Sequence, residues 1–531
     1  MGRNAAGESF LRGLIQHGSS KAIGAVVASP EHASGFSKTV QRYQPELGVQ
    51  IFHEDKLSEP SSPDIIFYPG PDLGKHAYQR SIFGSASWSL CGITHTTSSA
   101  GAMDALVNLV TGPLKHWDAV ICPSHSVKEN AVRVIEAQKE YLKNKLGATK
   151  FELPQLPVIP LGIHTEDFNF TDSQRASFRS SIGADSESIV VTYMGRLSFH
   201  AKAHPLAMYQ ALSLAAEKTQ KKIILVECGW HANEYIKASF EEAAKAICPA
   251  VRHLHLDGRD RRNRDTAWAS ADIFCSFSDN IQETFGIVPI EAMAASVPSV
   301  VSDWNGYKDS VREGVDGFRI PTMMPGPNSG PDLALRHAIG KDTYDMYCGL
   351  TSSMISVDII SAADAFTRLI ESPELRAEMG AAGKKRAEQI YDWSVIIPSY
   401  EALWSELNDR RTKEVGLVEK IKNSWPARLD PFYAFEHYAS SLLKIDTTLA
   451  LVDVDAKQAM LRYRSYLNLK MVNYNTYLMP EEAVVSSIFN SLNDGPLKAA
   501  EILIRVDARG NGFVFRYFAA LLKLGLVKIQ K

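Results

Sequence analysis

The sequence predicts an α/β protein with two domains, each built on a doubly wound parallel sheet, followed by a mainly helical extension. The 531 residues, 45% of them hydrophobic, suffice for two to three cores. Over about the first 400 residues, short apolar runs alternate with helical patterns, which is typical of parallel strands covered by helices on both faces. Strand-like runs become rare after that. The boundaries expected are 1–175, 176–410 and 411–531.

The strands of the two sheets are expected in six apolar runs: 21–28, 64–70, 117–124, 188–195, 222–229 and 271–278. Amphipathic helices are expected between them, among others at 126–147 and 205–220. A proline-containing break from Pro154 to Asp185 separates the two domains. Ligands of such sheets bind beyond the carboxyl ends of the strands, so the site is expected in the cleft between the domains. A loop rich in proline and glycine, 321–332, interrupts the second domain.

The composition indicates the cellular compartment of the protein but does not indicate a binding partner. The net charge of −3 offers no bulk attraction to nucleic acid or to an anionic membrane. The six cysteines are scattered without metal-binding spacing, which indicates buried thiols in a reducing compartment. The first ten residues lack the apolar core of a signal peptide, and no run of 18 apolar residues occurs. A cytoplasmic protein is the prediction.

The extension, residues 411–531, begins with a charged linker or exposed helix. Its last 36 residues read as helix, turn, helix and short strand, the order of a winged helix. From 430 to 531 there are 12 basic against 10 acidic residues, so a packing or protein-contact role is favoured and no nucleic acid is expected. The acidic pair Asp453 and Asp455, which resembles a metal-binding Asp-x-Asp, is interpreted as the N-terminus of a helix.

The run 280–295, "NIQETFGIVPIEAMAA", places Glu283 and Glu291 eight positions apart among apolar and small residues. Buried carboxylates are costly unless they are paired or belong to a site. The run predicts a glycine turn at Gly286 and a helix with Pro289 and Glu291 in its first turn, where a carboxylate is favoured. Strand, turn and helix N-terminus form a phosphate site. At such a site, Glu291 can bind a ribose diol and Glu283 can bind sugar hydroxyls. The alternatives are that Glu291 only stabilises the helix dipole and that Glu283 is a solvated loop acid.

The run 282–318 resembles the signature of the retaining nucleotide-sugar glycosyltransferases of family 4, the group 1 glycosyltransferases, which have the GT-B fold of two facing Rossmann-like domains. The resemblance implies that Glu283 contacts donor-sugar hydroxyls and that Glu291 contacts the ribose. Three residues would offer backbone groups to the sugar and the diphosphate: Thr284, Phe285 and Gly286.

Three further residues fit the same family. Arg196 follows a strand and Lys202 comes six residues later, so two cations can converge on a pyrophosphate and stabilise the charge of a leaving nucleotide. His95, at a strand end, matches the histidine near the transferring sugar. The alternatives are two solvated surface cations and a core histidine. The resemblance implies four catalytic residues: His95, Arg196, Lys202 and Glu283.

The chain departs from the family at two places. Ser296 stands where many members have glycine. The first ten residues look loop-like and run into a helix, whereas members usually open with a strand and a glycine-rich loop; Gly7 is assigned to the border of the phosphates. The resemblance covers about residues 7–407 and not the last hundred or so.

The resemblance implies a retaining, metal-independent hexosyltransferase without a cofactor. It would move a sugar from a UDP- or GDP-sugar donor to a glycan or lipid-linked acceptor in polysaccharide or glycoconjugate assembly. The alternatives are a disaccharide phosphorylase or nucleotide-sugar epimerase on the same fold, and a non-catalytic nucleotide-sugar sensor whose C-terminal module is the output. Peripheral membrane contact and oligomerisation through the extension are left open.

Overall fold

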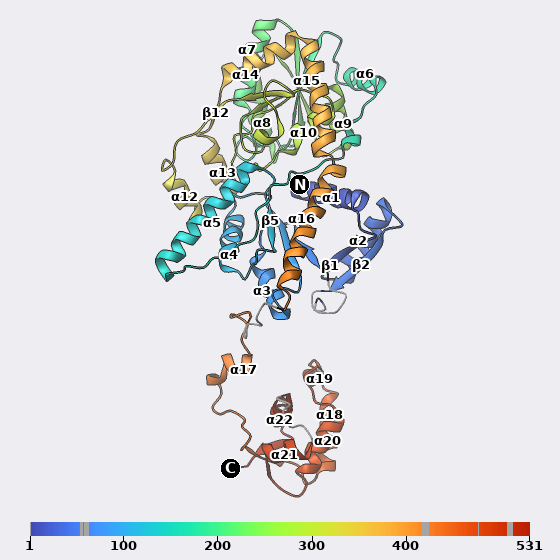
Figure 1. The fold of residues 1–531 in the computed structure, drawn as a ribbon, viewed down its shortest axis with the longest axis vertical. Helices are drawn as coiled ribbons and strands as arrows, with labels where there is room; N and C mark the ends of the chain where they lie inside the picture. The colour runs from blue at the N-terminus through green and yellow to red at the C-terminus, as the bar shows by residue number, and fades with distance from the viewer. Residues whose placement is uncertain are drawn as a thin grey trace. The chain divides into compact units, whose positions relative to one another are not determined.

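The computed structural model describes residues 2–53, 57, 63–416, 424–475, 477–506 and 513–530. The chain forms two compact units, Met1–Trp425 and Pro426–Lys531. The first unit (blue to orange in Figure 1) contains two domains built on parallel strands. The predicted α/β fold class is therefore confirmed, while the boundaries at 175 and 410 stay predictions.

The first domain has five parallel strands in two sheets. β1 pairs with β2, and β4 lies between β3 and β5. Every residue of β4 is buried, which explains its continuous apolar pattern. The elements are α1 (Gly2–His17), β1 (Ala22–Val27), α2 (Pro30–Tyr43), β2 (Gly48–His53), β3 (Ile65–Phe67), α3 (Gly74–Phe83), β4 (Ser89–Ile93), α4 (Ala100–Thr111), β5 (Ala119–Ile121), α5 (His125–Leu146) and the 3-10 helix η2 (Thr165–Phe168).

The second domain has six parallel strands in the order β8-β7-β6-β9-β10-β11. Counted from β6, this is the order 3-2-1-4-5-6 of a doubly wound sheet, which reverses between β6 and β9. In doubly wound sheets, ligands bind at the carboxyl ends of the two strands between which the order reverses. The elements are α6 (Asp172–Ser181), β6 (Ser188–Met194), α7 (Leu206–Thr219), β7 (Lys222–Gly229), α8 (Glu234–Ile247), β8 (Arg252–Asp257), α9 (Arg261–Ser270), β9 (Ile273–Ser276), α10 (Ile287–Ala294), β10 (Ser299–Ser302), α11 (Tyr307–Ser310), β11 (Gly317–Ile320), α14 (Ile359–Glu371), α15 (Pro373–Arg386) and the π-helix η3 (Ala387–Tyr391).

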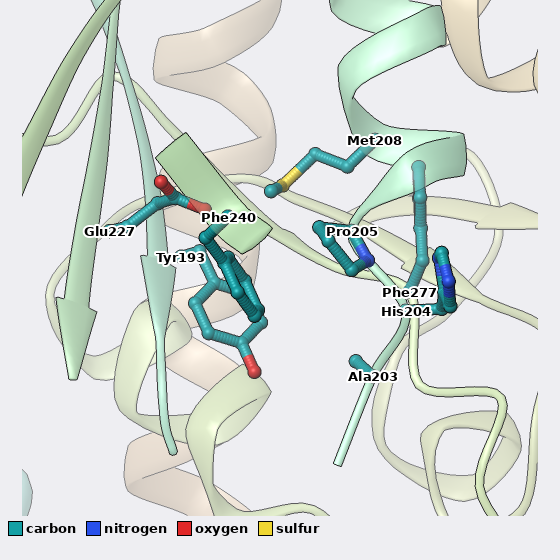
Figure 2. A pocket seen from close by; sticks show the side chains of 8 residues that line it. All are labelled: Tyr193, Ala203, His204, Pro205, Met208, Glu227, Phe240 and Phe277. Atoms are coloured by element: carbon teal, nitrogen blue, oxygen red, sulfur yellow. The ribbon is translucent and has the colours of Figure 1, made fainter. Parts of the chain in front are cut away.

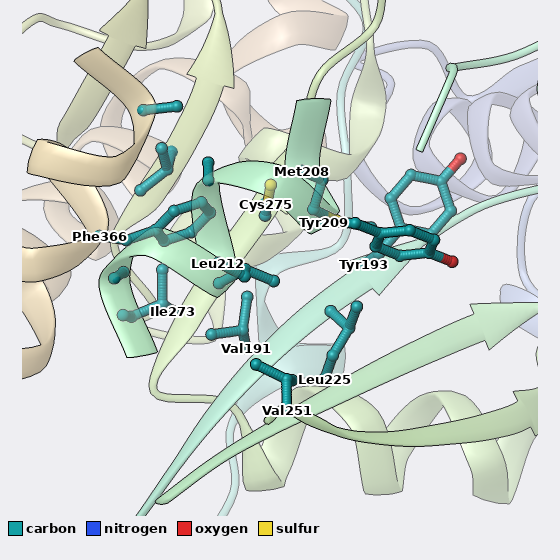
Figure 3. Close-up of a cluster of buried hydrophobic side chains, with 14 of the residues drawn as sticks. Val191, Tyr193, Met208, Tyr209, Leu212, Leu225, Val251, Ile273, Cys275 and Phe366 are labelled. Atoms are coloured by element: carbon teal, nitrogen blue, oxygen red, sulfur yellow. The ribbon is translucent and has the colours of Figure 1, made fainter. Parts of the chain in front are cut away.

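Each face of this second sheet carries its own apolar core. On one face, Val191 and Leu225 of the strands pack with Leu212 of α7 and Phe366 of α14 (Figure 3). On the other face, α9 and α10 contribute Trp268 and other apolar side chains. Because both faces are covered, the central strands β6 and β7 are buried almost throughout, and the ends of the strands remain for polar chemistry.

The last helix of this unit, α16 (Trp393–Glu414), packs on the first domain against α1 and β4. Trp393 and Tyr400 are buried in this contact. Near its end, Arg411 donates to the Asp64 carboxylate over 2.7 Å. The helix that follows the second domain in sequence thus belongs in space to the first.

The loop expected over the first ten residues is wrong, because α1 already begins at Gly2. Phe10 of α1 lies against the rings of Phe67 and Tyr400 at centroid distances of 5.1 and 5.2 Å. Tertiary packing of this kind supplies most of a helix's stability and outweighs the poor helix propensity of glycine.

The second unit combines helices with a small antiparallel sheet in the order β15-β14-β16. α21 and α22, followed by β16, give the expected helix, helix and strand, while 507–512, where the turn falls, lie outside the described residues. Asp455 caps the N-terminus of α18 and Asp453 pairs with Arg462, so the helix-terminus interpretation is confirmed. The elements are α17 (Pro431–Ala434), η4 (Glu436–Tyr438), β14 (Thr448–Leu451), α18 (Ala456–Leu467), α19 (Lys470–Asn473), α20 (Glu482–Ser491), β15 (Leu497–Lys498), α21 (Ala499–Arg505), α22 (Phe513–Lys523) and β16 (Val527–Ile529).

Two expectations from composition can be compared with the structure. All six cysteines are buried and free, as predicted. Within the described ranges, none of the helices combines the length and the apolar character needed to span a bilayer.

Candidate active site

The predicted site residues lie where strands of the two domains end. Arg196 and Lys202 follow β6, Glu283 follows β9, and His95 follows β4. The loops after β6 and β9 flank the point at which the strand order of the second sheet reverses. The carboxyl ends of strands from different domains therefore meet, as expected for facing sheets.

Lys202 and Glu283 form an ion pair across the two loops of the second domain. Their side chains are only 21% and 10% exposed. Burial raises the pKa of the Glu283 carboxyl, but the charge and hydrogen bond of Lys202 and the backbone amide of Thr284 prevail, so the pKa lies below its ordinary value. Glu283 is therefore held as a carboxylate inside the cleft, and the interpretation as a solvated loop acid is wrong.

Gly286 makes the turn into α10. Its φ of 77° is one that favours glycine, and a Cβ atom there would lie 2.0 Å from the ring of Tyr307. Tyr307 in turn exchanges a 2.9 Å hydrogen bond with Ser276 of β9. No side chain other than hydrogen fits this position, so the backbone can turn sharply beside Glu283 and begin the helix.

The prediction that Glu291 lies in the first turn of this helix is wrong. α10 starts at Ile287, so Pro289 is the third residue and falls in the first turn as expected, whereas Glu291 is the fifth. The helix starts earlier because Gly286, and not the proline, supplies the turn. A dipole-stabilising role for Glu291 loses its basis, since that effect falls off within the first turn.

Glu291 is instead a half-buried carboxyl facing a cation. Burial raises its pKa to about 7, and the charge of Arg264 on α9 opposes the rise. Arg264 is held by the Gly258 carbonyl, to which it donates over 2.9 Å. In its ionised form, a carboxyl of this kind can accept hydrogen bonds from vicinal hydroxyls.

Hydrogen bonds join the two domains across the site. The Thr284 hydroxyl donates to the His95 carbonyl over 3.0 Å. The Ser124 hydroxyl, at the start of α5, donates to the Thr284 carbonyl over 2.7 Å. The structure thus brings His95 to Thr284, the residue next to Glu283. The backbone amide and carbonyl of Thr284, which were expected to face the donor, already have protein partners. The adjacent Phe285 side chain lies in the core beside Tyr391.

Arg196 lies in the same loop as Lys202 and is half-buried. Its guanidinium donates to the Ala201 carbonyl over 2.7 Å, and this bond connects the two ends of the loop from Arg196 to Lys202. Gly7 and His95 both line one cavity of about 530 Å³, together with Ile287 at the start of α10. The border role assigned to Gly7 stays a prediction.

Ser296, the departure noted in the signature, has a φ of 63°, in the left-handed region. Glycine adopts this conformation without strain, whereas other residues pay a cost of about 1–2 kcal/mol. The structure therefore explains why glycine is common there.

A second, much smaller pocket lies behind the Lys202 loop and is shown in Figure 2 with Tyr193, His204 and Glu227 at its wall. Its volume of about 10 Å³ is at most that of one water molecule. Glu227 is buried there and accepts a 2.7 Å hydrogen bond from Tyr209. This pocket has no room for a nucleotide sugar. The hydrogen bond from Tyr209 accounts for the buried carboxylate of Glu227 without a ligand.

Sequence reasoning missed three polar residues of the site. Asp279, after β9, is 5% exposed, and burial raises its pKa to about 7. The Asn305 side chain donates to the Glu283 carbonyl and accepts a 3.3 Å bond from Ser124, so it fixes both sides of the cleft. Arg264 faces Glu291. Asp279 and Asn305 follow β9 and β10, so their places as polar residues after strands were a signal for them, whereas Arg264 lies within α9 and gave no such signal.

In the part of the chain that the structure describes, His, Cys, Asp and Glu side chains do not gather in threes to form a metal site. The cations next to the site are side chains, Lys202 at Glu283 and Arg264 near Glu291.

Comparison with known families agrees with the motifs. Residues 174–324 match the family described as "Glycosyl transferases group 1". Over these residues the chain is similar to the group 1 glycosyltransferases. The match includes Arg196, Lys202 and both glutamates, and it begins with the second domain.

Curated relatives are similar to part of the chain. A phosphatidyl-myo-inositol mannosyltransferase from Mycobacterium leprae is 31% identical over 148 residues, which are 28% of this chain and 30% of that protein. The enzyme of that name from Mycobacterium tuberculosis is 23% identical over 281 residues, which are 53% and 60% of the two chains. This chain thus spans less than two thirds of these relatives.

Among solved structures, HepE from Anabaena in complex with UDP aligns with a TM-score of 0.48 and 17% identity, covering 75% of this chain and 96% of that one.

Proposed function

We propose that the protein is a retaining glycosyltransferase that moves a sugar from a nucleotide-sugar donor to a hydroxyl of a glycan or lipid-linked acceptor. The observation that carries the proposal is the Lys202–Glu283 ion pair at the point where the sheet order reverses, next to the glycine turn into α10. The family match over 174–324 supports it.

In this proposal the second domain holds the donor. Glu291 accepts hydrogen bonds from the ribose diol, and the backbone amides at the start of α10 face the diphosphate. Glu283 accepts hydrogen bonds from hydroxyls of the transferred sugar. Arg196 and Lys202 neutralise the charge that develops on the diphosphate as it leaves, so the scheme needs no metal or other cofactor.

The transfer breaks the bond between the anomeric carbon and the phosphate oxygen. The acceptor oxygen forms its bond to the anomeric carbon on the same face, so the configuration is retained. The proton of the acceptor hydroxyl passes to the oxygen of the leaving phosphate, which departs as part of the nucleoside diphosphate. The cross-domain bonds of Thr284 and Ser124 keep the cleft closed and thereby limit hydrolysis of the donor by water.

The acceptor class is proposed from the relatives. Two of the relatives are named for phosphatidyl-myo-inositol and, in a Mycobacterium protein that is 27% identical over 215 residues, for D-inositol 3-phosphate. Both are polyols with a phosphate group, so we propose an acceptor that presents a ring hydroxyl, in glycolipid or polysaccharide assembly. UDP- and GDP-sugars are the donors to test first.

The test is release of nucleotide from a panel of UDP-, GDP-, ADP- and dTDP-sugars, read by mass spectrometry with EDTA present. We expect release from one donor, its loss in Glu283→Gln, and normal release in Glu242→Gln, a substitution of an exposed glutamate on α8. Nucleotide binding without release from any donor would instead favour a sensor. Phosphate-dependent turnover of a disaccharide without any nucleotide would favour a phosphorylase.

A further inference from the structure

We propose that Tyr344, on a segment inserted into the second domain, is a positioning residue of the transfer site that keeps water from the donor sugar. The inference rests on the proposed function. The inserted segment, 321–358, lies between β11 and α14 and contains the proline- and glycine-rich loop. Its elements are β12 (Thr322–Met323), α12 (Pro331–Ala338), α13 (Tyr344–Ser352) and β13 (Ser356–Val357).

The inserted segment leaves and rejoins the domain at one place. β12 and β13 pair antiparallel, with Met323 opposite Ser356, and the Asp358 amide donates to the Pro321 carbonyl over 2.9 Å. Arg336 holds the turn between the two helices through a bidentate pair with Asp342, at 2.6 and 2.7 Å. The segment is therefore a defined structure, and α13 has a fixed place.

Helix α13 lies against the three loops that carry the predicted catalytic residues. A Cβ atom on Gly349 would lie 2.9 Å from His200, in the loop of Arg196 and Lys202. Cys348 is fully buried, with its sulfur 3.9 Å from the Ser98 hydroxyl in the loop of His95. α13 thus covers the place where these loops meet.

The Tyr344 hydroxyl lies at the centre of this contact. It exchanges hydrogen bonds with the hydroxyls of Thr96, at 3.2 Å, and Ser98, at 3.3 Å, and it donates to the Gln282 side chain over 3.4 Å. Thr96 is the neighbour of His95 and Gln282 is the neighbour of Glu283. One phenol therefore links the first domain to the second beside both residues of the sugar site.

A phenol suits this position because its apolar ring displaces water while its hydroxyl satisfies the polar groups that would otherwise hold water. Burial raises the pKa of Tyr344, and its serine and threonine partners only partly offset the rise, so the hydroxyl keeps its proton to donate. Without it, the polar groups of Thr96, Ser98 and Gln282 would be solvated. A water molecule there could attack the anomeric carbon in place of the acceptor, giving free sugar and nucleoside diphosphate.

The test compares Tyr344→Phe with Tyr347→Phe, a matched change one turn along α13 on a tyrosine that stacks on His337 of α12. With the donor selected by the nucleotide-sugar panel and no acceptor, Tyr344→Phe should hydrolyse the donor about 3 to 10 times faster, the effect of one hydrogen bond. The dissociation constant for the nucleoside diphosphate should change less than twofold. Tyr347→Phe should match the wild type in both.

Amide hydrogen exchange tests the contact of Tyr344 with the two loops independently of the proposed function. Peptides covering 94–99 and 281–286 should exchange faster in Tyr344→Phe and not in Tyr347→Phe. Unchanged exchange would overturn the contact, and faster exchange with unchanged hydrolysis would overturn the role in excluding water. If the protein uses none of the nucleotide sugars of the panel as a donor, the proposed function is overturned. The exchange result then decides by itself whether Tyr344 links the loops.

Discussion

Removing the ammonium of Lys202 is the perturbation whose consequences the structure defines best. In Lys202→Met the carboxylate of Glu283 stays buried without its partner. Breaking a buried pair by removing one member costs about 3–5 kcal/mol, and because both groups keep slight exposure we expect about 3 kcal/mol. An unfolding entropy of about 2.1 cal/mol/K per residue over the 425-residue unit gives about 0.9 kcal/mol/K, so Tm should fall by about 3 °C.

The loss should depend on pH. In the wild type the pKa of Glu283 is lowered, so the stability from the pair is complete above the unfolded value and is lost as pH falls through the folded value. Without Lys202, burial prevails and raises the pKa above the unfolded value, so the destabilisation grows as pH rises. Tm of Lys202→Met should therefore fall further at pH 8 than at pH 5.

A double-mutant cycle with Glu283→Gln checks this reasoning by thermal unfolding. Lys202→Met/Glu283→Gln contains no unpaired charge, so it should be more stable than Lys202→Met at pH 8, with a coupling of about 1.5–3 kcal/mol. Additive losses, or a loss for Lys202→Met that is the same at both pH values, would refute the ion pair as a structural unit. Turnover in Lys202→Met should drop by about two to three decades.

Further predictions concern other parts of the first unit. With a pKa of about 7 for Glu291, affinity for a nucleotide sugar should rise about tenfold from pH 6 to 8, and Glu291→Gln should flatten this profile in calorimetric titrations. Ser296→Gly should raise stability by about 0.5–1 kcal/mol in thermal unfolding, and a lower Tm would contradict the strain assigned to its φ. A fragment of residues 1–425 should keep donor turnover, whereas 1–410, which lacks Arg411, should unfold at lower temperature. Donor turnover should be the same with and without EDTA, and strict dependence on an added divalent ion would refute the metal-free scheme.

The sequence predicted the second domain well because its strands are buried on both faces. Continuous apolar runs such as 188–195 and 222–229 became β6 and β7 nearly residue for residue. Shorter or partly exposed strands were missed, β8 among them, because they lack a continuous apolar run. The sequence order also hides that α16 returns to the first domain, since packing between distant segments leaves no local pattern.

Part of the site was also predictable from the sequence, because its residues follow predicted strands. Glu283, Arg196, Lys202 and His95 stand next to strand ends, so topology brings their loops together. The direct pairing of Lys202 with Glu283 could not be read from two residues 81 positions apart. Tyr344 gave no signal, because the inserted segment matches no motif and its contacts arise only from the folded cleft.

Separate roles for the two glutamates are the centre of this account, and calorimetric titration of the nucleoside diphosphate and of its nucleotide sugar tests them directly. Glu291→Gln should bind both ligands more weakly, because both contain the ribose. Glu283→Gln should bind the nucleoside diphosphate like the wild type and lose affinity for the nucleotide sugar alone. Equal losses for both ligands in Glu283→Gln, or unchanged binding of both in Glu291→Gln, would contradict the assignment.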